Sequence, residues 1–166
     1  MDFRNLNSNT EPDSYPLPNV DDLIDQCYGS KYFSQLDLAS GYWGIPINEP
    51  DKFKTAFSTP RGKFEFNRMP FGLVNAQATF QRCMDNVVEE VKRRGGHGID
   101  AYVDNIIIFS QSFEIHLKTL LILLEVLDEC KLSLRGDKCE IGHASIEFLG
   151  FCLDGKNLKP SPDLTL

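Results

Sequence analysis

Two aspartates stand where a carboxylate is costly unless it has a partner. Asp37 ends residues 32–38, in which apolar and polar residues alternate. Asp104 lies between two short apolar arms, residues 101–103 and 106–109. Burying a carboxylate among apolar residues costs free energy unless the group is paired or holds a cation. If the two segments are neighbouring strands, the carboxylates can meet, and with substrate phosphates they supply the oxygen ligands that Mg²⁺ favours. Two such ions can activate a hydroxyl and stabilise the leaving oxygen in phosphoryl transfer.

A purely structural interpretation of the same residues stays open. Asp104-Asn105 is a common turn pair in β-hairpins, because both residues tolerate positive φ. Asp37 can equally be a capping or turn residue at a strand end. The residue types alone therefore do not decide between a metal site and two turns.

The elements that would position the aspartates follow from hydrophobic periodicity and from proline and glycine. Prolines mark residues 1–18 as an extended strap, after which Asn19 caps a short helix. Alternation predicts a strand over residues 32–38, and residues 99–110 form a predicted β-hairpin. Residues 147–155 predict a strand that enters another hairpin. Three shorter strand candidates are residues 45–47, 55–58 and 63–67.

Helical spacing of apolar residues predicts two long helices. The first runs from its cap Asn75 to a stop at Gly95, and the second covers residues 113–130. The leucines of the second helix that are available for burial are Leu117, Leu120, Leu121, Leu124 and Leu127. The order of strands, helix, hairpin, helix and strands indicates an α+β fold with the helices packed on one face of an antiparallel sheet. The sequence has no repeat or linker, so we expect one domain over residues 1–166.

The composition is that of a globular protein inside the cell. Hydrophobic residues make up 42% and charged residues 25% of the chain. No long apolar run predicts a membrane span, and the N-terminus has no secretory signal. The five cysteines are odd in number and widely scattered, which indicates reduced thiols.

The net charge of −7 argues against nucleic acid as a partner. A nucleic-acid binder usually carries a basic face, because neutralising phosphates supplies most of its non-specific affinity. Local acid at a metal site, and basic segments outside this chain, would account for the difference.

The chain carries a series of motifs in residues 2–7, 15–18, 36–42, 68–82, 102–110 and 148–150. In order and spacing they resemble the motifs of reverse transcriptases of gypsy-like retrotransposons. Residues 102–110 resemble the signature hairpin, in which a tyrosine and a variable residue precede two aspartates. Residues 36–42 resemble the first catalytic strand of the family. The other segments are residues 68–82, which resemble the loop and helix between these two motifs, residues 2–7 and 15–18, which resemble the start of the fingers, and residues 148–150, which resemble the primer-grip hairpin.

The resemblance implies a right-hand fingers-and-palm fold with a ferredoxin-like palm core, and it assigns roles. Asp37 and Asp104 would hold two catalytic Mg²⁺ ions, with the Leu38 carbonyl as a backbone ligand. Tyr42 would lie beneath the nucleotide sugar and exclude a 2′-hydroxyl. The remaining roles fall to Phe71 and Gly72, which would border the incoming nucleotide and template, and to Arg4, Tyr102, Leu149 and Gly150, which would lie at the template or primer.

Some of these residues have a structural alternative. Tyr42 can be only a packed aromatic residue, although Gly41 leaves room for a sugar and so favours the selecting role. Phe71 can be a core residue, and Leu149-Gly150 can be a packed turn.

Other residues suggest metal binding without the spacing it needs. Cys139, His143 and Cys152 lack the paired spacing of zinc ligands, so we interpret them as structural. His97 and His116 are expected at the surface.

The sequence departs from the family at Asn105, where the family has a second aspartate. Asparagine keeps an oxygen but loses the charge, and one unit charge at about 4 Å is worth roughly 4 kcal/mol at an effective dielectric constant of about 20. We therefore expect weak binding of the second Mg²⁺ and severely impaired polymerase activity. Val74 and Gln77 replace a lysine and a proline usual in this loop, which removes one charge that would face phosphate.

The sequence thus predicts an RNA-directed DNA polymerase domain of a gypsy-like LTR retrotransposon Pol polyprotein, which adds deoxynucleotides to a primer 3′ end and is weak or inactive as this chain. We expect residues 1–166 to be truncated at both ends, without thumb, connection or ribonuclease H. Its partners would be template-primer, deoxynucleoside triphosphates and the rest of the polyprotein, without a membrane, in the cytoplasm, virus-like particles or nucleus. The alternatives are a catalytically dead retroelement remnant and a non-catalytic ferredoxin-like nucleic-acid-binding module.

Overall fold

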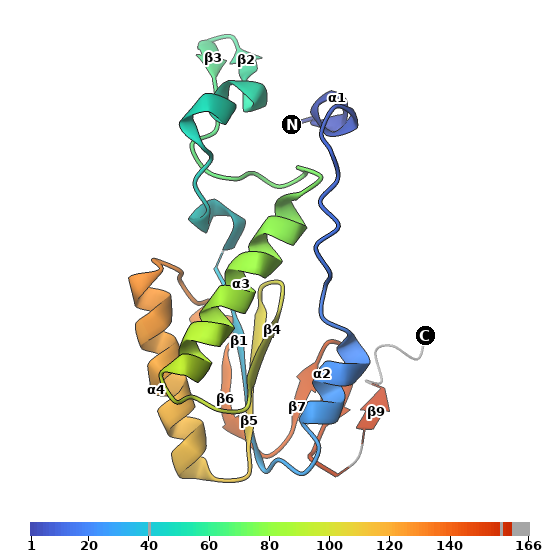
Figure 1. The fold of residues 1–166 in the computed structure, drawn as a ribbon, viewed down its shortest axis with the longest axis vertical. Coiled ribbons are helices and arrows are strands. Elements are labelled where there is room, and N and C mark those ends of the chain that lie inside the picture. Colours follow the sequence, from blue (N-terminus) through green and yellow to red (C-terminus); the bar gives the residue numbers. More distant parts are fainter. Residues whose placement is uncertain (40, 157, 161–166) are drawn as a thin grey trace.

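The computed structural model describes residues 1–39, 41–156 and 158–160, and an antiparallel sheet lies at its centre (Figure 1). The elements of the sheet and its helices are β1 (Tyr32–Asp37), α3 (Ala76–Arg93), β4 (Ile99–Tyr102), β5 (Asn105–Ser110), α4 (Phe113–Glu129) and β6 (Glu140–His143). They follow the chain as β-α-β-β-α-β, and the strands lie in the order β4-β5-β1-β6, which is the ferredoxin-like arrangement. The predicted α+β fold with both long helices on one face is confirmed.

The sheet is buried on both faces because its central strand β5 is apolar on both sides. Ile106, Ile107 and Ile108 are all 0% exposed. Ile106 and Ile108 belong to the larger core, with α3 and α4, whereas Ile107 belongs to a smaller core on the other face. The smaller core is closed by α2 (Val20–Gln26) and by a second sheet of β7 (Ile146–Phe148), β8 (Phe151–Leu153) and β9 (Leu158–Pro160). Successive residues of a strand point to opposite faces, which gives this division.

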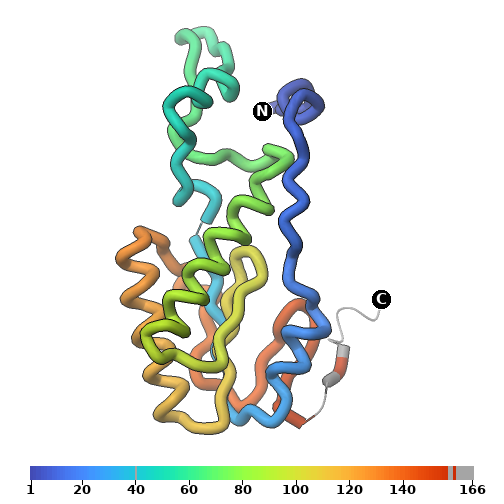
Figure 2. Tube along the Cα trace, viewed as in Figure 1, coloured from blue at the N-terminus to red at the C-terminus, as the bar shows by residue number. Residues whose placement is uncertain are grey.

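A smaller lobe extends beyond the start of α3, and the N-terminal strap runs beside α3 to reach it (Figure 2). The elements of this lobe are α1 (Arg4–Ser8), η1 (Gly41–Gly44), η2 (Glu49–Thr55), β2 (Phe57–Thr59) and β3 (Gly62–Phe64). Outside the lobe, the short helix η3 (Gly136–Lys138) precedes β6. The predicted strand at residues 45–47 is wrong, since Pro46 forms only an isolated bridge with Arg68. A proline has no N–H to donate to a ladder. Helix α1 was not predicted.

Helix α4 buries only two of the five leucines predicted to be available for burial, Leu120 and Leu127. Leu117, Leu121 and Leu124 are 43%, 53% and 41% exposed, so their predicted burial is wrong. The buried residues are His116, Thr119, Leu120, Leu123, Val126 and Leu127. The helix is apolar on nearly every side, and its contact with the sheet selects the face. No helix in the described part of the chain is long and apolar enough to cross a membrane.

His116 was expected at the surface, but it is only 1% exposed. Its ring lies between two serines of the sheet, with Nε2 2.6 Å from Ser34 Oγ and Nδ1 3.2 Å from Ser110 Oγ. The backbone N–H of Gly142 also donates to Ser34 Oγ (3.0 Å). These contacts join α4, β1, β5 and β6, and desolvation lowers the pKa of His116. His97 is exposed, as predicted.

Acidification should destabilise the protein through His116. Its folded-state pKa lies below the unfolded value of 6.5, so unfolding takes up a proton at mildly acidic pH. The stabilising contribution is therefore complete above the unfolded pKa and is lost as the pH falls through the folded pKa. We expect the Tm to fall between about pH 8 and about pH 5.5 by more in this protein than in a His116→Gln variant, measured by circular dichroism. Equal falls in both proteins would contradict the role of this imidazole.

Candidate active site

The end of β1 meets the tip of the β4–β5 hairpin. Asp37 lies opposite Asn105 at the end of the β1–β5 ladder, and the Leu38 N–H donates to the Asp104 carbonyl oxygen (3.0 Å). Both aspartates line one pocket of about 200 Å³. The other residues that line it are Leu38, Gly41, Tyr42, Phe71, Phe80, Arg135 and Lys138. The structure thus brings together the two carboxylates and the Leu38 backbone that the sequence had suggested as metal ligands.

The hairpin turn consists of Val103 and Asp104, because Tyr102 and Asn105 form its closing pair. The alternative of an Asp104-Asn105 turn pair is wrong, since Val103 has the positive φ (53°) and Asn105 begins β5. A β-branched residue in the left-handed region is a steric outlier. Such strain costs about 1–3 kcal/mol and persists only where the surrounding structure enforces it.

Gln81 enforces the turn from α3. This side chain is 0% exposed, and its Oε1 accepts a hydrogen bond from the Val103 N–H (2.7 Å). Its Nε2 donates to the Ala101 carbonyl oxygen (3.1 Å) and to Asp85 Oδ1 (2.8 Å). Sequence reasoning gave Gln81 no role. Its signal was a polar residue on the apolar face of a helix, next to Phe80 and one turn before Met84 and Asp85.

The space beside Gly41 is filled by Phe80. A Cβ at Gly41 would lie 2.3 Å from Phe80 Cζ, so the expectation that Gly41 leaves room for a sugar is wrong. Tyr42 packs against Phe80 and Phe71, with ring centroids 5.2 Å and 5.0 Å apart. Desolvation, and secondarily the charge of Asp104, raise the pKa of Tyr42. Tyr42 is therefore a neutral, partly buried aromatic residue in the wall of the pocket.

The loop before α3 holds Phe71 at the mouth of the pocket. Phe71 is 58% exposed, so the alternative that it is a core residue is wrong. The next residue, Gly72, has φ of 91°, and its carbonyl accepts from Asn7 Nδ2 (2.8 Å). Asn7 Oδ1 accepts from the Val74 N–H (2.9 Å). Helix α1 therefore fixes the loop that carries Phe71 and Gly72.

Two cations face the two carboxylates. Arg135 Nε lies 3.9 Å from Asp37 Oδ1, and the Arg135 N–H donates to the Asp37 carbonyl oxygen (2.8 Å). Lys138 lines the same pocket, so the formal charges of the four side chains cancel. Among the described residues, no group of three or more His, Cys, Asp or Glu side chains could hold a metal ion. The pocket therefore has a smaller acidic set than two cations would need.

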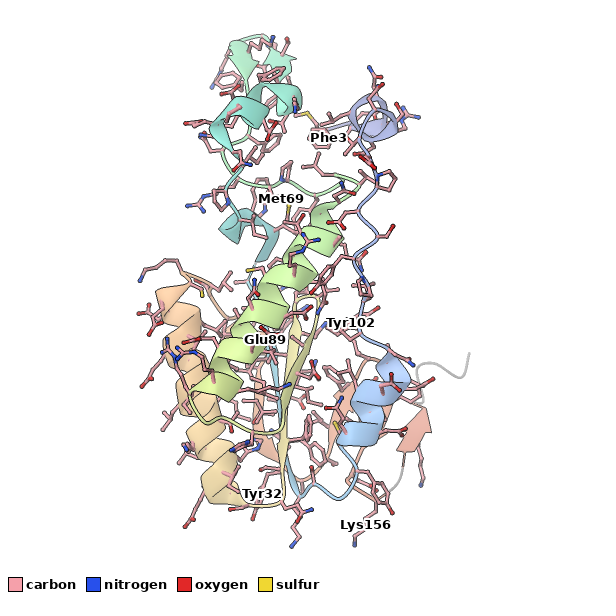
Figure 3. All side chains as sticks on the ribbon, viewed as in Figure 1. Phe3, Tyr32, Met69, Glu89, Tyr102 and Lys156 are labelled. Carbon is pink, nitrogen blue, oxygen red and sulfur yellow. The ribbon has the colours of Figure 1, made fainter. Side chains whose placement is uncertain are left out.

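Neither Arg4 nor Tyr102, which were predicted to lie at the template or primer, lines this pocket. Figure 3 labels Phe3, the neighbour of Arg4, toward one end of the molecule, and Tyr102 near its middle, beside the hairpin tip. Arg4 pairs with Asp2 (2.6 Å) and does not line the pocket. Tyr102 closes the hairpin turn and packs against both cores.

Leu149 and Gly150 form the turn between β7 and β8, with φ of 48° and 81°. They do not line the pocket of Asp37 and Asp104, and Leu149 packs against the smaller core. Their predicted primer contact stays a prediction.

Cys139, which was interpreted as structural, donates a hydrogen bond from its thiol to the Arg135 carbonyl oxygen (3.1 Å).

Comparisons with known sequences show which family the chain belongs to. The sequence profile of a family described as reverse transcriptase (RNA-dependent DNA polymerase) matches residues 1–153. The chain is 42% identical over 162 residues to the retrovirus-related Pol polyprotein from transposon 297 of Drosophila melanogaster, covering 98% of the chain and 15% of that protein. It is 38% identical over 163 residues to the Pol polyprotein from transposon gypsy of the same organism, covering 98% of the chain and 16% of that protein. The chain thus spans less than a fifth of these relatives.

Solved structures show the same fold. The foamy viral protease-reverse transcriptase dRH, solved with double-stranded DNA, has a TM-score of 0.87 at 23% identity, over 98% of this chain and 28% of that one. The foamy viral protease-reverse transcriptase solved with an RNA/DNA hybrid has a TM-score of 0.84 at 25% identity, over 98% of this chain and 21% of that one.

Replacing Gly41 with alanine should destabilise the protein, because the new Cβ would meet the Phe80 ring. We expect Gly41→Ala to lower the free energy of unfolding by about 1–3 kcal/mol, measured by urea denaturation. Gly136→Ala is the matched control, since a Cβ there meets nothing within 4 Å. A Phe80→Leu change should recover part of the loss in the Gly41→Ala background. Equal stability of the two glycine variants would show that the ring moves aside without cost.

Proposed function

We propose, from the premise that the chain belongs to the reverse transcriptase family, that it forms the fingers and palm of an RNA-directed DNA polymerase of a gypsy-like LTR retrotransposon. One observation carries the proposal, namely the pocket that Asp37 and Asp104 share at the meeting point of β1 and the hairpin. Two carboxylates held by a rigid sheet meet the need of phosphoryl transfer for fixed charge at the reacting phosphate.

The donor set fits one Mg²⁺ better than two. Asp37, Asp104 and the Leu38 carbonyl supply hard oxygen ligands for one ion, which would activate the primer hydroxyl and neutralise phosphate charge. A second ion would need more negative charge than this pocket has beside Arg135 and Lys138. Reverse transcriptases generally use divalent metal ions, and this chain keeps the ligands for one of them.

The substrate side of the pocket is apolar. Tyr42 and Phe71 meet edge to face, and both line the pocket that contains the carboxylates. In the proposal, Tyr42 lies beneath the sugar of a deoxynucleoside triphosphate and Phe71 borders its base, while the template-primer lies across the pocket. The rest of a Pol polyprotein supplies the thumb.

Asn105 is expected to impair catalysis without disturbing the fold. Its backbone completes both ladders of β5, which any residue can do. Its Nδ2 lies 3.5 Å from Asp104 Oδ1, so a neutral amide stands where the family has a carboxylate. The lost charge lowers metal affinity, and the pocket cations remain.

The alternative of a non-catalytic module that stacks bases on its sheet finds little support. Such a module needs a sheet face with exposed aromatic residues. Here α3 and α4 cover one face and α2 with the second sheet covers the other, and Phe33 of β1 is 0% exposed. A catalytically dead remnant remains as an outcome of the next experiment.

Restoring the aspartate should raise polymerase activity. We expect Asn105→Asp to increase primer extension on a primed RNA template with Mg²⁺ by about 100-fold or more, since it returns one charge to the metal ligands. Both proteins are assayed fused to the thumb of a close relative. An Asp104→Asn change in the Asn105→Asp background should abolish the gain.

Each outcome of that assay has a separate meaning. Equal extension in both proteins would show that Asn105 suffices as a ligand. No extension in either protein, with circular dichroism showing both folded, would favour the remnant.

Removing Arg135 should strengthen metal binding directly. Its guanidinium is the cation beside Asp37, and a partly exposed ion pair of this kind contributes up to about 1 kcal/mol. We expect Arg135→Gln to tighten the Kd for Mn²⁺ by about 3- to 5-fold, measured by isothermal titration calorimetry. Arg61→Gln in the β2–β3 turn is the control for net charge. A Kd that changes equally in both variants would assign the effect to the global field.

A further inference from the structure

We propose that Tyr15, in the N-terminal strap, is a positioning residue for the hairpin tip that carries Asp104, acting through Asp85 and Gln81. The inference rests on the proposed function for its catalytic consequence. Its structural content, however, can be tested without activity.

The strap contacts the N-terminal part of α3, beside which it runs in Figures 1 and 2. The predicted helix cap Asn75 makes no side-chain cap bond. Its Oδ1 accepts from the Asp13 N–H (2.9 Å), and its Nδ2 donates to the Glu11 carbonyl oxygen (2.8 Å). Arg82 Nη2 donates to Asp13 Oδ2 (2.7 Å). These contacts hold residues 11–15 in one place against the helix.

Tyr15 connects this strap to two side chains of α3, Arg82 and Asp85. The Arg82 guanidinium lies over the Tyr15 ring, 4.5 Å from its centroid. The Tyr15 hydroxyl donates a hydrogen bond to Asp85 Oδ2. The same hydrogen bond raises the pKa of Tyr15, as expected for a phenol that donates to a carboxylate. The hydroxyl therefore stays a donor over the working pH range of the protein.

Asp85 and the Ala101 carbonyl together determine which way the Gln81 amide points. A carboxylate and a carbonyl oxygen both accept hydrogen bonds, so the NH₂ group of Gln81 faces Asp85 Oδ1 (2.8 Å) and the Ala101 carbonyl oxygen (3.1 Å). The opposite atom, Oε1, is thereby presented to the Val103 N–H (2.7 Å). If the amide were reversed, its NH₂ group would face the N–H of Val103, and that buried donor would have no acceptor.

The hairpin tip needs this support because Val103 has a positive φ of 53°. A strained turn relaxes when the contact that enforces it is lost. Asp104 follows Val103 directly, so relaxation would move a proposed metal ligand. Tyr15 thus links the N-terminal strap to the geometry of the metal site, although more than eighty residues separate it from Asp104 in the sequence.

The first test is a comparison of Tyr15→Phe with Tyr28→Phe. Tyr15→Phe keeps the ring under Arg82 but removes the donor to Asp85, and Tyr28 is a matched tyrosine that is 77% exposed. On the 166-residue chain, we expect hydrogen exchange of the Val103 amide to accelerate by about 10-fold in Tyr15→Phe only. Exchange of the Val88 amide in α3 should stay unchanged and serves as the internal reference.

A second variant tests the inner link. Asp85→Asn offers a donor as well as an acceptor, so only the Ala101 carbonyl oxygen then holds the NH₂ group of Gln81 in its present orientation. We expect the same acceleration of hydrogen exchange at the Val103 amide, together with a larger Kd for Mn²⁺. An effect in Asp85→Asn but not in Tyr15→Phe would overturn the role of Tyr15, and no effect in either would overturn the whole connection.

These readouts separate the inference from the proposed function. If neither the parent chain nor Asn105→Asp extends a primer, exchange at Val103 still decides whether Tyr15 positions the tip. If Asn105→Asp is active, adding Tyr15→Phe should lower kcat about 10-fold and leave the KM for the deoxynucleotide unchanged. An active enzyme with an unchanged kcat would reject the inference and leave the polymerase proposal intact.

Discussion

The register of β1 against β5 is the constraint on which the site depends. Asp37 lies opposite Asn105, and the ladder ends where the hairpin turns back, so one carboxylate comes from each side of the junction. A slip of one residue would exchange the two faces of β1 and move Leu36 out of the larger core. Because both faces of the sheet are covered, such a slip would expose or crowd apolar side chains on each side. Core packing therefore places the two aspartates more firmly than any contact between them.

The residues that determine the fold differ from those that determine the chemistry of the site. Asn105 takes part in the ladders through its backbone, and its half-buried side chain is not among those that line the pocket. The core that sets the register consists of residues on β1, β5, α3 and α4 that the substitution does not touch. A charge beside Asp104 can consequently be lost at little cost to folding. The strained Val103 is the exception, because its conformation is maintained by a polar contact from Gln81.

The sequence allowed β1, the β4–β5 hairpin and both long helices to be predicted, since alternation and helical spacing report which residues face a core. It also predicted that Asp37 and Asp104 meet if their strands are neighbours, but it did not predict β6 of the central sheet. The buried face of α4, the burial of His116 and the conformation of Val103 depend on tertiary contacts, which sequence periodicity does not report. Helix α4 is apolar nearly all round, so its spacing offered several faces, and the sheet selected the one that contains Leu123. His116 is buried because a serine 82 positions away supplies a hydrogen-bond partner. The positive φ fell on Val103 because strand pairing placed the turn one residue earlier than turn preferences suggested.

The acidic balance of the chain, which argued against nucleic acid, is a property of the whole molecule and not of the lobe beside the pocket. Phosphate contacts respond to local potential, which falls off within about 10 Å at moderate salt. Between residues 49 and 68 the basic residues are Lys52, Lys54, Arg61, Lys63 and Arg68, and the acidic ones are Glu49, Asp51 and Glu65. Much of the negative charge lies instead on α2 and α4, on Asp21, Asp22, Asp25, Glu114, Glu125, Asp128 and Glu129. Lys52 and Lys54 pair with Glu49 and Asp51, which leaves Arg61, Lys63 and Arg68 as the basic residues of this segment that a template-primer crossing toward the smaller lobe would meet, so the net charge of −7 is unevenly distributed.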